Sequence, residues 1–278
     1  MWFYIARRVN LFVFTVAVLF LLVFVMLNAL PGELATNLSG VQNPTIAQYD
    51  AIVSQYQLDK SWFNQYISFI KQRIHGDFGV SFSDGKPIFD EMLRLLPATI
   101  ELCIYAMTIA LLLGLPLGII AAVYYKKFGD FFLLGTSLIG YSIPVFWLGV
   151  IAIMYFGLDL QWLPVAGQLN LLYQVEHVTG FTLIDIYLSD IVYKQLAYQD
   201  AIAHLIMPTL TLAVIPATVV IRITRTTMLE ELNANYIKAA QARGQHPLSV
   251  IFHHALPNAI QPVLSQITLQ LSTLLTSA

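Results

Sequence analysis

The chain has 278 residues, of which 58% are hydrophobic and only 11% are charged, and its formal net charge is −2 at pH 7. Soluble domains carry about 25% charged residues, so this composition excludes one or two ordinary soluble domains. The sequence therefore predicts an all-α membrane protein. The single cysteine, Cys103, lies in an apolar run and cannot form an intramolecular disulfide, so we expect a buried, inert thiol.

The first apolar run covers residues 9–30 and follows Arg7 and Arg8. It is longer than the apolar core of about 7–15 residues in a secretory signal, and it lacks a small-residue cleavage site. We therefore expect a retained transmembrane helix. Because basic residues favour the cytoplasmic side, residues 1–30 are assigned to a cytoplasmic N-terminal segment and the first span.

Residues 31–95 are predicted to form a periplasmic region. Apolar residues recur at helical spacing in its middle, which predicts two short amphipathic helices on the outer face, separated near residues 58–60. The stretch 75–87 is rich in turn residues and is expected to be a loop.

Residues 96–278 contain four further predicted spans, which makes five in all; these spans are 96–125, 131–158, 201–227 and 258–278. The connection 159–200 is expected outside, with one short helix, and the connection 228–257 inside. Basic residues gather on the predicted inner side and acids on the second outer loop, as the positive-inside rule requires. Pro144 lies within the third span, so we expect a kink near residues 140–144, where Ser142 can satisfy the freed carbonyl.

Motifs for enzymatic chemistry do not occur in the sequence: it has no Walker A, H-E-x-x-H, C-x-x-C or G-x-S-x-G pattern. We therefore expect a chain that is no enzyme and binds no cofactor, metal or nucleic acid. His246, His253 and His254 cluster in sequence, and we expect them to face lipid headgroups or a partner subunit.

The longest polar passage of the C-terminal half runs from Arg222 to Pro257. A helix over about residues 231–243 would bring Tyr236, Ala239, Ala240 and Arg243 onto neighbouring positions. Small side chains let another protein approach the backbone closely, which favours a cytoplasmic docking surface. An ordinary amphipathic surface helix explains the same spacing equally well.

Three residues mark where this helix and the next one end or begin. Gly244 suits a left-handed C-terminal cap. Pro247 can open a second short helix, and Pro257 is expected to end it before the fifth span.

Glu101 is an acid one turn into the second predicted span. An acid inside a span is a candidate for a translocation pathway, and we name Ser142 and Pro144 as further candidates. The alternative is an interfacial carboxylate that caps the start of its own helix beside Pro97 and Thr99.

The segments YIKAAQARG and HHALPNAI resemble the EAA-loop signature of ATP-binding-cassette importer permeases. The resemblance implies that the coupling residues are Tyr236, Lys238, Ala239, Ala240, Arg243, Gly244, Leu256 and Pro257. The chain departs from the signature at two positions. It has Lys238 where the signature begins with an acid, and His254 where the signature has an isoleucine.

The similarity extends over nearly the whole chain. YQLDKSW, GDFGVS, LPATIEL, GLPLG, GYSIPVFWLG and WLPVAG resemble the first permease of dipeptide and oligopeptide transporters, and TGFTLIDIYLSD is most similar to the Sap permeases of that branch. This implies the type I importer permease fold (MetI-like). Such permeases have a sixth span after an E-x-x-F-x-x-P-G-x-G segment, so we expect the chain to be truncated before it.

The resemblance also implies partners and a substrate class. A similar second permease, two cytoplasmic ATPase subunits that carry ATP and Mg²⁺, and a periplasmic solute-binding protein would assemble with this chain in the bacterial inner membrane. The expected substrates are peptides, with cationic antimicrobial peptides as one class, or alternatively putrescine. Two other classes of function are an ATP-independent channel or carrier, which would need inverted repeats or several midplane charges, and a membrane anchor or scaffold, which would not need prolines in three spans.

Overall fold

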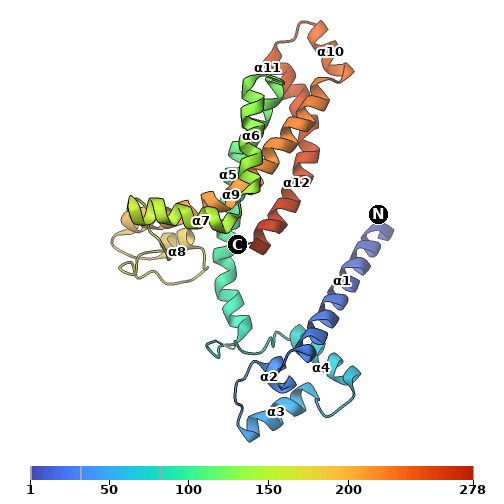
Figure 1. Cartoon of the computed structure of the whole chain (residues 1–278), viewed down its shortest axis with the longest axis vertical. Helices are drawn as coiled ribbons and strands as arrows, with labels where there is room; N and C mark the ends of the chain where they lie inside the picture. Colours follow the sequence, from blue (N-terminus) through green and yellow to red (C-terminus); the bar gives the residue numbers. More distant parts are fainter. Residues whose placement is uncertain (1, 32, 82, 278) are drawn as a thin grey trace. The chain divides into compact units, whose positions relative to one another are not determined.

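The computed structural model describes residues 2–31, 33–81 and 83–277 (Figure 1). Across these ranges the secondary structure is helical, and the only β-pairing is an isolated bridge between Val80 and Pro87. The chain divides into two compact units, Met1–Leu95 and Leu96–Ala278. The helical architecture confirms the predicted all-α class.

The first unit contains the helices α1 (Trp2–Ala29), α2 (Leu34–Ser39), α3 (Ile46–Tyr56) and α4 (Trp62–Ile74). α3 and α4 correspond to the two predicted short helices, whereas α2 was not predicted. α3 starts where its sequence favours a start, because Thr45 and Gln48 form a reciprocal capping box.

An aromatic cluster forms the core of the first unit. The ring of Phe24, the one buried residue among those described in α1, lies 5.5 Å from Tyr66 and 5.4 Å from Phe69. The Arg73 guanidinium stacks 4.8 Å above Phe69 and donates to the carbonyl of Leu38 at 3.0 Å. These contacts let a charged side chain close the end of an apolar cluster. Most of α1 leaves its apolar side chains exposed, as expected of a helix surrounded by lipid.

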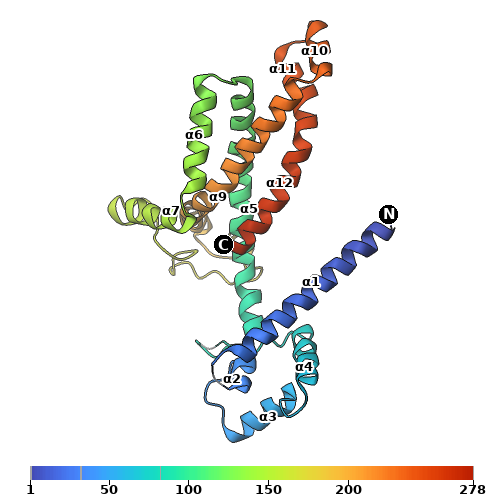
Figure 2. The same cartoon turned by 45° about the vertical axis from the view of Figure 1, so that its right-hand side comes forward.

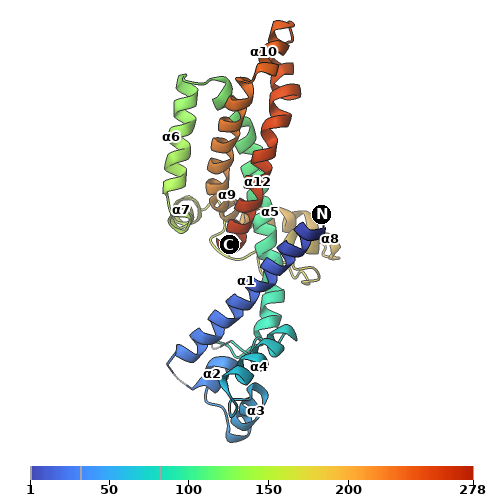
Figure 3. The ribbon, with the colours of Figure 1, turned by 90° about the vertical axis from the view of Figure 1, so that its right-hand side faces the viewer.

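The second unit is built around one long helix, α9 (Lys194–Leu232). α9 packs against α6, α7, α8 and α12, and Figures 2 and 3 show α5, α6, α9 and α12 side by side. α5 (Ile88–Val123) begins in the first unit and belongs to the second from Leu96 onward. The other elements are α6 (Phe128–Ser142), α7 (Val145–Ala152), the π-helix η1 (Ile153–Asp159), α8 (Thr182–Leu188), α10 (Asn235–Ala242), α11 (Pro247–Ser249), the π-helix η2 (Val250–Ala255) and α12 (Leu256–Ser277). The thiol of Cys103 is buried between α5, α9 and α12, as predicted.

α5 and α9 approach each other closely at two glycines. A Cβ atom on Gly114 would lie 2.7 Å from the Cβ of Val220, and one on Gly118 would lie 2.6 Å from the Cβ of Thr224. The four-residue spacing puts both glycines on one face of α5. This small-xxx-small arrangement is typical of helices that pack tightly within a membrane.

Among the described residues, three helices are long and apolar enough to cross a membrane: α1, α5 and α9. Counting α6 and α7–η1 together as one broken span gives a fourth. α12 has 22 residues, but it is not among these candidates, so the count of five spans stays a prediction. α5 and α9 have 36 and 39 residues, about 54 and 58 Å at 1.5 Å per residue, and therefore exceed a hydrocarbon core of about 30 Å.

The kink expected near residues 140–144 is present, but the third predicted span is broken there and is not a continuous helix. α6 ends at Ser142, and the chain turns by 95° before α7 begins. Pro144 is therefore the N-cap of α7 and not a mid-helix residue. The physical reason is the proline itself, since it disfavours helical geometry in the residue before it, and Ile143 is extended with φ −85° and ψ 126°.

Candidate functional site

Residues 233–255, which we call the connecting segment, join α9 to α12 and include α10, α11 and η2. α10 lies at one end of the bundle and α8 at the other (Figure 1). The helix predicted over 231–243 is interrupted: α9 continues through Leu232, and α10 starts at Asn235. The Asn233 side chain donates to the Leu229 carbonyl at 2.7 Å, and such bonds to the local backbone compete with helix continuation.

The inner face of α10 is apolar and fixed to the bundle. Ile237 and Ala240 are buried and join Met228, Val250 and Ala255 in one hydrophobic cluster. The side chain of Ala240 therefore faces the inside of the chain, and its role in coupling stays a prediction. Its place three residues after Ile237 puts it on the inward stripe of the helix.

The outer face of α10 carries most of the remaining predicted coupling residues. Lys238, Ala239, Arg243 and Gly244 are exposed, and Tyr236 is 40% exposed. Gly244 has φ +77°, which confirms the predicted left-handed cap. Its N–H donates to the Gln241 carbonyl at 2.9 Å, and the next N–H donates to the Ala240 carbonyl at 3.4 Å. This pair of bonds is a Schellman motif, which ends the helix without leaving its last carbonyls unpaired.

The two prolines of the connecting region behave differently. Pro247 opens α11 as predicted, after His246, whose Nδ1 accepts from the Leu248 N–H at 3.3 Å. Pro257 does not end a helix, because it is the second residue of α12, next to the half-buried Leu256. The π-helical turns of η2 widen the helix just before this proline and accommodate its ring.

The Tyr236 hydroxyl joins three elements. It donates to the carboxylate of Glu231 at the end of α9, and it accepts from the Asn258 amide at 3.0 Å, at the start of α12. Burial and the hydrogen bond to Glu231 raise the pKa of Tyr236, so the phenol remains protonated and can donate. Neither Glu231 nor Asn258 was identified from the sequence, because no local pattern links them to Tyr236.

The histidines of the connecting segment lie at two different elements. His246 caps α11, and His253 and His254 lie in η2. Within the described ranges, no group of three or more His, Cys, Asp or Glu side chains is arranged to hold a metal ion.

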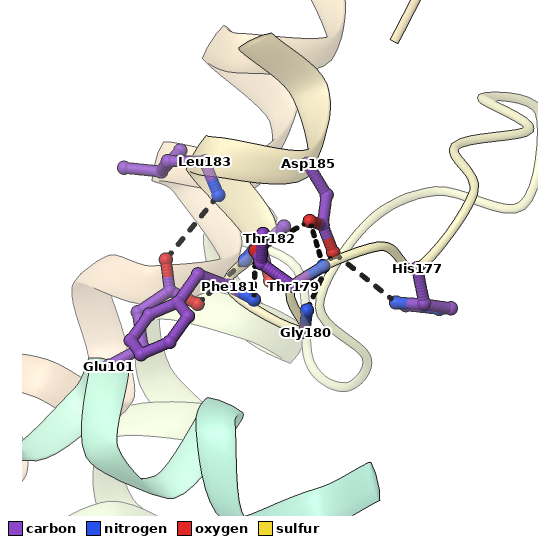
Figure 4. Close-up of polar contacts among 8 residues, drawn as sticks. All are labelled: Glu101, His177, Thr179, Gly180, Phe181, Thr182, Leu183 and Asp185. Carbon is purple, nitrogen blue, oxygen red and sulfur yellow. Dashed lines mark hydrogen bonds and ion pairs between the residues drawn. The ribbon is translucent and has the colours of Figure 1, made fainter. Parts of the chain in front are cut away.

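Glu101 lies at the other end of the bundle, where its buried carboxylate caps α8 (Figure 4). It accepts from the Thr182 N–H at 2.9 Å and the Leu183 N–H at 3.4 Å, which begin α8. The Tyr105 hydroxyl donates to it at 3.2 Å. Glu101 is therefore a helix-capping carboxylate, as the alternative predicted, but it caps α8 and not the start of its own helix, α5.

Asp185 folds the turn that precedes α8 (Figure 4). Its carboxylate accepts from the N–H and hydroxyl of Thr179 at 2.7 and 2.6 Å and from the Gly180 N–H at 3.0 Å. Burial alone would raise the pKa of Asp185, but these bonds, with His177 at 4.0 Å, hold that pKa below its usual value. A Cβ on Gly180 would lie 2.8 Å from Pro97, so this turn packs directly on α5.

A buried ion pair joins α6 to α9. Arg225 donates to both oxygens of Asp130, at 2.5 and 2.8 Å, and Asp130 is only 2% exposed. The Lys126 N–H donates to the same carboxylate at 2.9 Å. The sequence marks these residues only as charges near the cytoplasmic side, since 95 positions separate the two partners.

Ser142 and Pro144 do not join Glu101 in one site. Both lie at the corner between α6 and α7, where Ser142 is exposed and its hydroxyl donates to the Leu138 carbonyl at 2.8 Å. No hydrogen bond within the described ranges connects them to Glu101. The three residues named for a translocation pathway therefore occupy different surroundings.

Comparison with known proteins finds one matching family and several relatives named as permeases. Residues 114–278 match the family described as "Binding-protein-dependent transport system inner membrane component". The "Di/tripeptide transport system permease protein DppB" of Pseudomonas aeruginosa (strain UCBPP-PA14) is 40% identical over 275 residues, which cover 99% of this chain and 81% of that protein.

Two further relatives carry a different system name. The "Peptide transport system permease protein SapB" of Salmonella typhimurium is 42% identical over 218 residues, covering 78% of this chain and 68% of that protein. The "Putrescine export system permease protein SapB" of Escherichia coli (strain K12) is 43% identical over 218 residues, with the same 78% and 68% coverage. The chain is therefore a multi-pass membrane protein that belongs to the family of inner-membrane permease subunits of binding-protein-dependent, ATP-binding-cassette transport systems.

Proposed function

We propose that this permease carries peptides across the bacterial inner membrane and that α10 docks on a separate ATPase subunit. The observation that carries this proposal is the form of α10. Its inner face is fixed in a hydrophobic cluster shared with α9, η2 and α12, while its outer face is exposed. A partner that pushes α10 therefore acts on both flanking helices, which an ordinary surface helix need not do.

The docking surface combines small, basic and apolar side chains. Ala239 and Gly244 allow close approach to the backbone, and Lys238 and Arg243 supply charge beside them. Leu248 in α11 and Phe252 in η2, later in the connecting segment, are also exposed and add apolar area. Exposed apolar side chains next to polar ones are typical of protein interaction sites.

The distribution of charge supports a cytoplasmic position for α10. The turn between α5 and α6 lies at the same end of the bundle as α10 (Figure 2) and contains Lys126 and Lys127. The loop that contains α8 carries mostly acids and lies at the opposite end. Since basic residues favour the inside, we place α10 and the N-terminus in the cytoplasm and α8 in the periplasm.

The assembly that we propose contains a second, similar permease, two cytoplasmic ATPase subunits and a periplasmic solute-binding protein, and membrane lipid surrounds the two permeases. ATP and Mg²⁺ bind to the ATPase subunits, and this chain contributes no cofactor site. Peptides are the first candidate substrate because two of the relatives above are named for peptide transport.

The test is to co-express the chain with its candidate partner subunits, purify through this chain, and measure ATP hydrolysis with trialanine, a cationic peptide or putrescine. We expect co-purified ATPase activity that a peptide stimulates. An isolated chain without bound ATPase would contradict the docking proposal.

A matched pair of glycine variants tests α10 itself. Gly244→Glu places a bulky acid on the proposed docking surface and should uncouple ATP hydrolysis from transport. Gly85→Glu is the control, because the two glycines have similar positive φ angles, +70° at Gly85 and +77° at Gly244, and a Cβ added at either would meet no other atom within 4 Å. Normal transport by Gly244→Glu would overturn the proposed surface.

Putrescine is the second candidate substrate. It is favoured by the Escherichia coli relative named for putrescine export, which is as similar in identity as the peptide permeases. Stimulation of ATP hydrolysis by putrescine and not by either peptide would select it.

A further inference from the structure

The Tyr236 hydroxyl is the one polar group of α10 that contacts both flanking helices through side chains among the described residues. It donates to Glu231 in the last turn of α9 and accepts from Asn258 in the first turn of α12. The Asn258 amide also donates to the His254 carbonyl at 3.0 Å, so the network includes η2. We call Tyr236, Glu231 and Asn258 the tyrosine junction.

The tyrosine junction and the apolar anchor of α10 hold the helix in different ways. Ile237 and Ala240 hold α10 against the bundle through burial, whose free energy does not depend on direction. Hydrogen bonds weaken steeply when their angle changes, so the junction also fixes direction. The acceptor is a carboxylate, which makes that bond stronger than one between neutral groups.

We infer that the Tyr236 hydroxyl is a positioning group that transmits movement of α10 to α9 and α12 together. This inference rests on the proposed function. It assigns Tyr236 a role inside the permease, whereas the family resemblance implies only contact with the ATPase. The ring remains 40% exposed and can still touch a partner, but its hydroxyl is directed to groups of the same chain.

The experiment uses Tyr236→Phe in the assembled complex, because phenylalanine keeps the ring and removes only the hydroxyl. We expect the ATPase subunit to co-purify at the wild-type ratio and to hydrolyse ATP. Trialanine transported per ATP should fall about tenfold, the factor that corresponds to one hydrogen bond to a charged acceptor. A smaller folded fraction would lower transport and hydrolysis equally, so this ratio separates positioning from a merely structural role.

Partner variants test the junction as a unit. Asn258→Ala should lower the same ratio, and adding it to Tyr236→Phe should cause little further loss, since the two groups act together. Glu231→Gln keeps an acceptor and should retain more coupling than Glu231→Ala. Tyr187→Phe, on the exposed surface of α8, is the matched control and should leave the ratio unchanged.

Wild-type transport per ATP in Tyr236→Phe would overturn the positioning role. Loss of the ATPase subunit from purified Tyr236→Phe would also overturn it, because the hydroxyl would then serve docking. Failure of the unmodified chain to bind any ATPase would instead refute the proposed function, so the two failures are distinguishable.

Discussion

Two buried acids, Glu101 and Asp130, show how similar burial can serve different purposes. Each is 2% exposed, and each joins segments far apart in the sequence. Glu101 accepts from neutral donors, namely two N–H groups of α8 and a tyrosine hydroxyl. Asp130 instead faces the guanidinium of Arg225.

This difference predicts what happens when each charge is lost. Without Asp130, the partly buried Arg225 remains with no counter-charge, and an uncompensated buried charge is costly. Without the charge of Glu101, its neutral donors still need only an acceptor. The nature of the partner therefore decides the cost, although the two carboxylates are equally inaccessible. The occupied carboxylate of Glu101 also fits a role in holding α8 better than one in attracting cations.

The largest expected effect is that of Asp130→Ala. Removing one member of a buried ion pair should lower the free energy of unfolding by about 3–5 kcal/mol. Thermal unfolding of the purified protein measures this loss, with Asp190→Ala as an exposed control. A loss as small as that of the control would mean that water screens the Arg225 charge.

Glu101→Ala should lower the free energy of unfolding by a smaller amount, about 1.5–3 kcal/mol, because it leaves the first N–H groups of α8 without an acceptor. Glu101→Gln keeps one acceptor oxygen and should lower the free energy of unfolding less than Glu101→Ala does. Amide hydrogen exchange at Thr182 and Leu183 should accelerate in the order wild type, Gln, Ala. Equal exchange in all three would remove Glu101 as the cap of α8.

A double substitution sharpens the contrast further. Asp130→Leu combined with Arg225→Met removes both charges. The free energy of unfolding of this double variant should lie within about 1 kcal/mol of the wild-type value, since apolar residues can replace a buried ion pair. The same unfolding assay measures it beside Asp130→Ala. A double variant as unstable as the single one would show that packing, and not the unpaired charge, causes the loss.

The smallest expected effect is the pH response of the turn before α8. The pKa of Asp185 is lowered in the fold, so its contribution is complete above the unfolded pKa of about 3.9 and is lost as pH falls through the folded value. The protection factors of the Thr179 and Gly180 amides, which correct exchange for its intrinsic pH dependence, should therefore fall only in acid, below about pH 4. In Asp185→Asn, the protection factors should be lower and should show no acid transition, because the amide keeps one acceptor oxygen but does not titrate.

Much of the helical architecture followed from local sequence. Periodic apolar residues predicted α3 and α4, and Gly244 predicted a left-handed cap, because both depend on neighbours within a few positions. The bend at Pro144 was located correctly, but its angle could not be predicted, since proline permits a break and the packing of α6 and α7 on α9 depends on the tertiary structure.

Length, composition and motif order by themselves determined that this is a helical membrane permease, because the cost of exposing apolar residues and the sterics of glycine and proline act over short distances. Only the tertiary structure decided that Ala240 is buried, that Glu101 caps α8, that Asp130 meets Arg225 and that Tyr236 joins α9 to α12. These contacts connect residues up to 95 positions apart or depend on which helix face is covered. Such pairings arise only when the helices pack, and no local pattern in the chain encodes them.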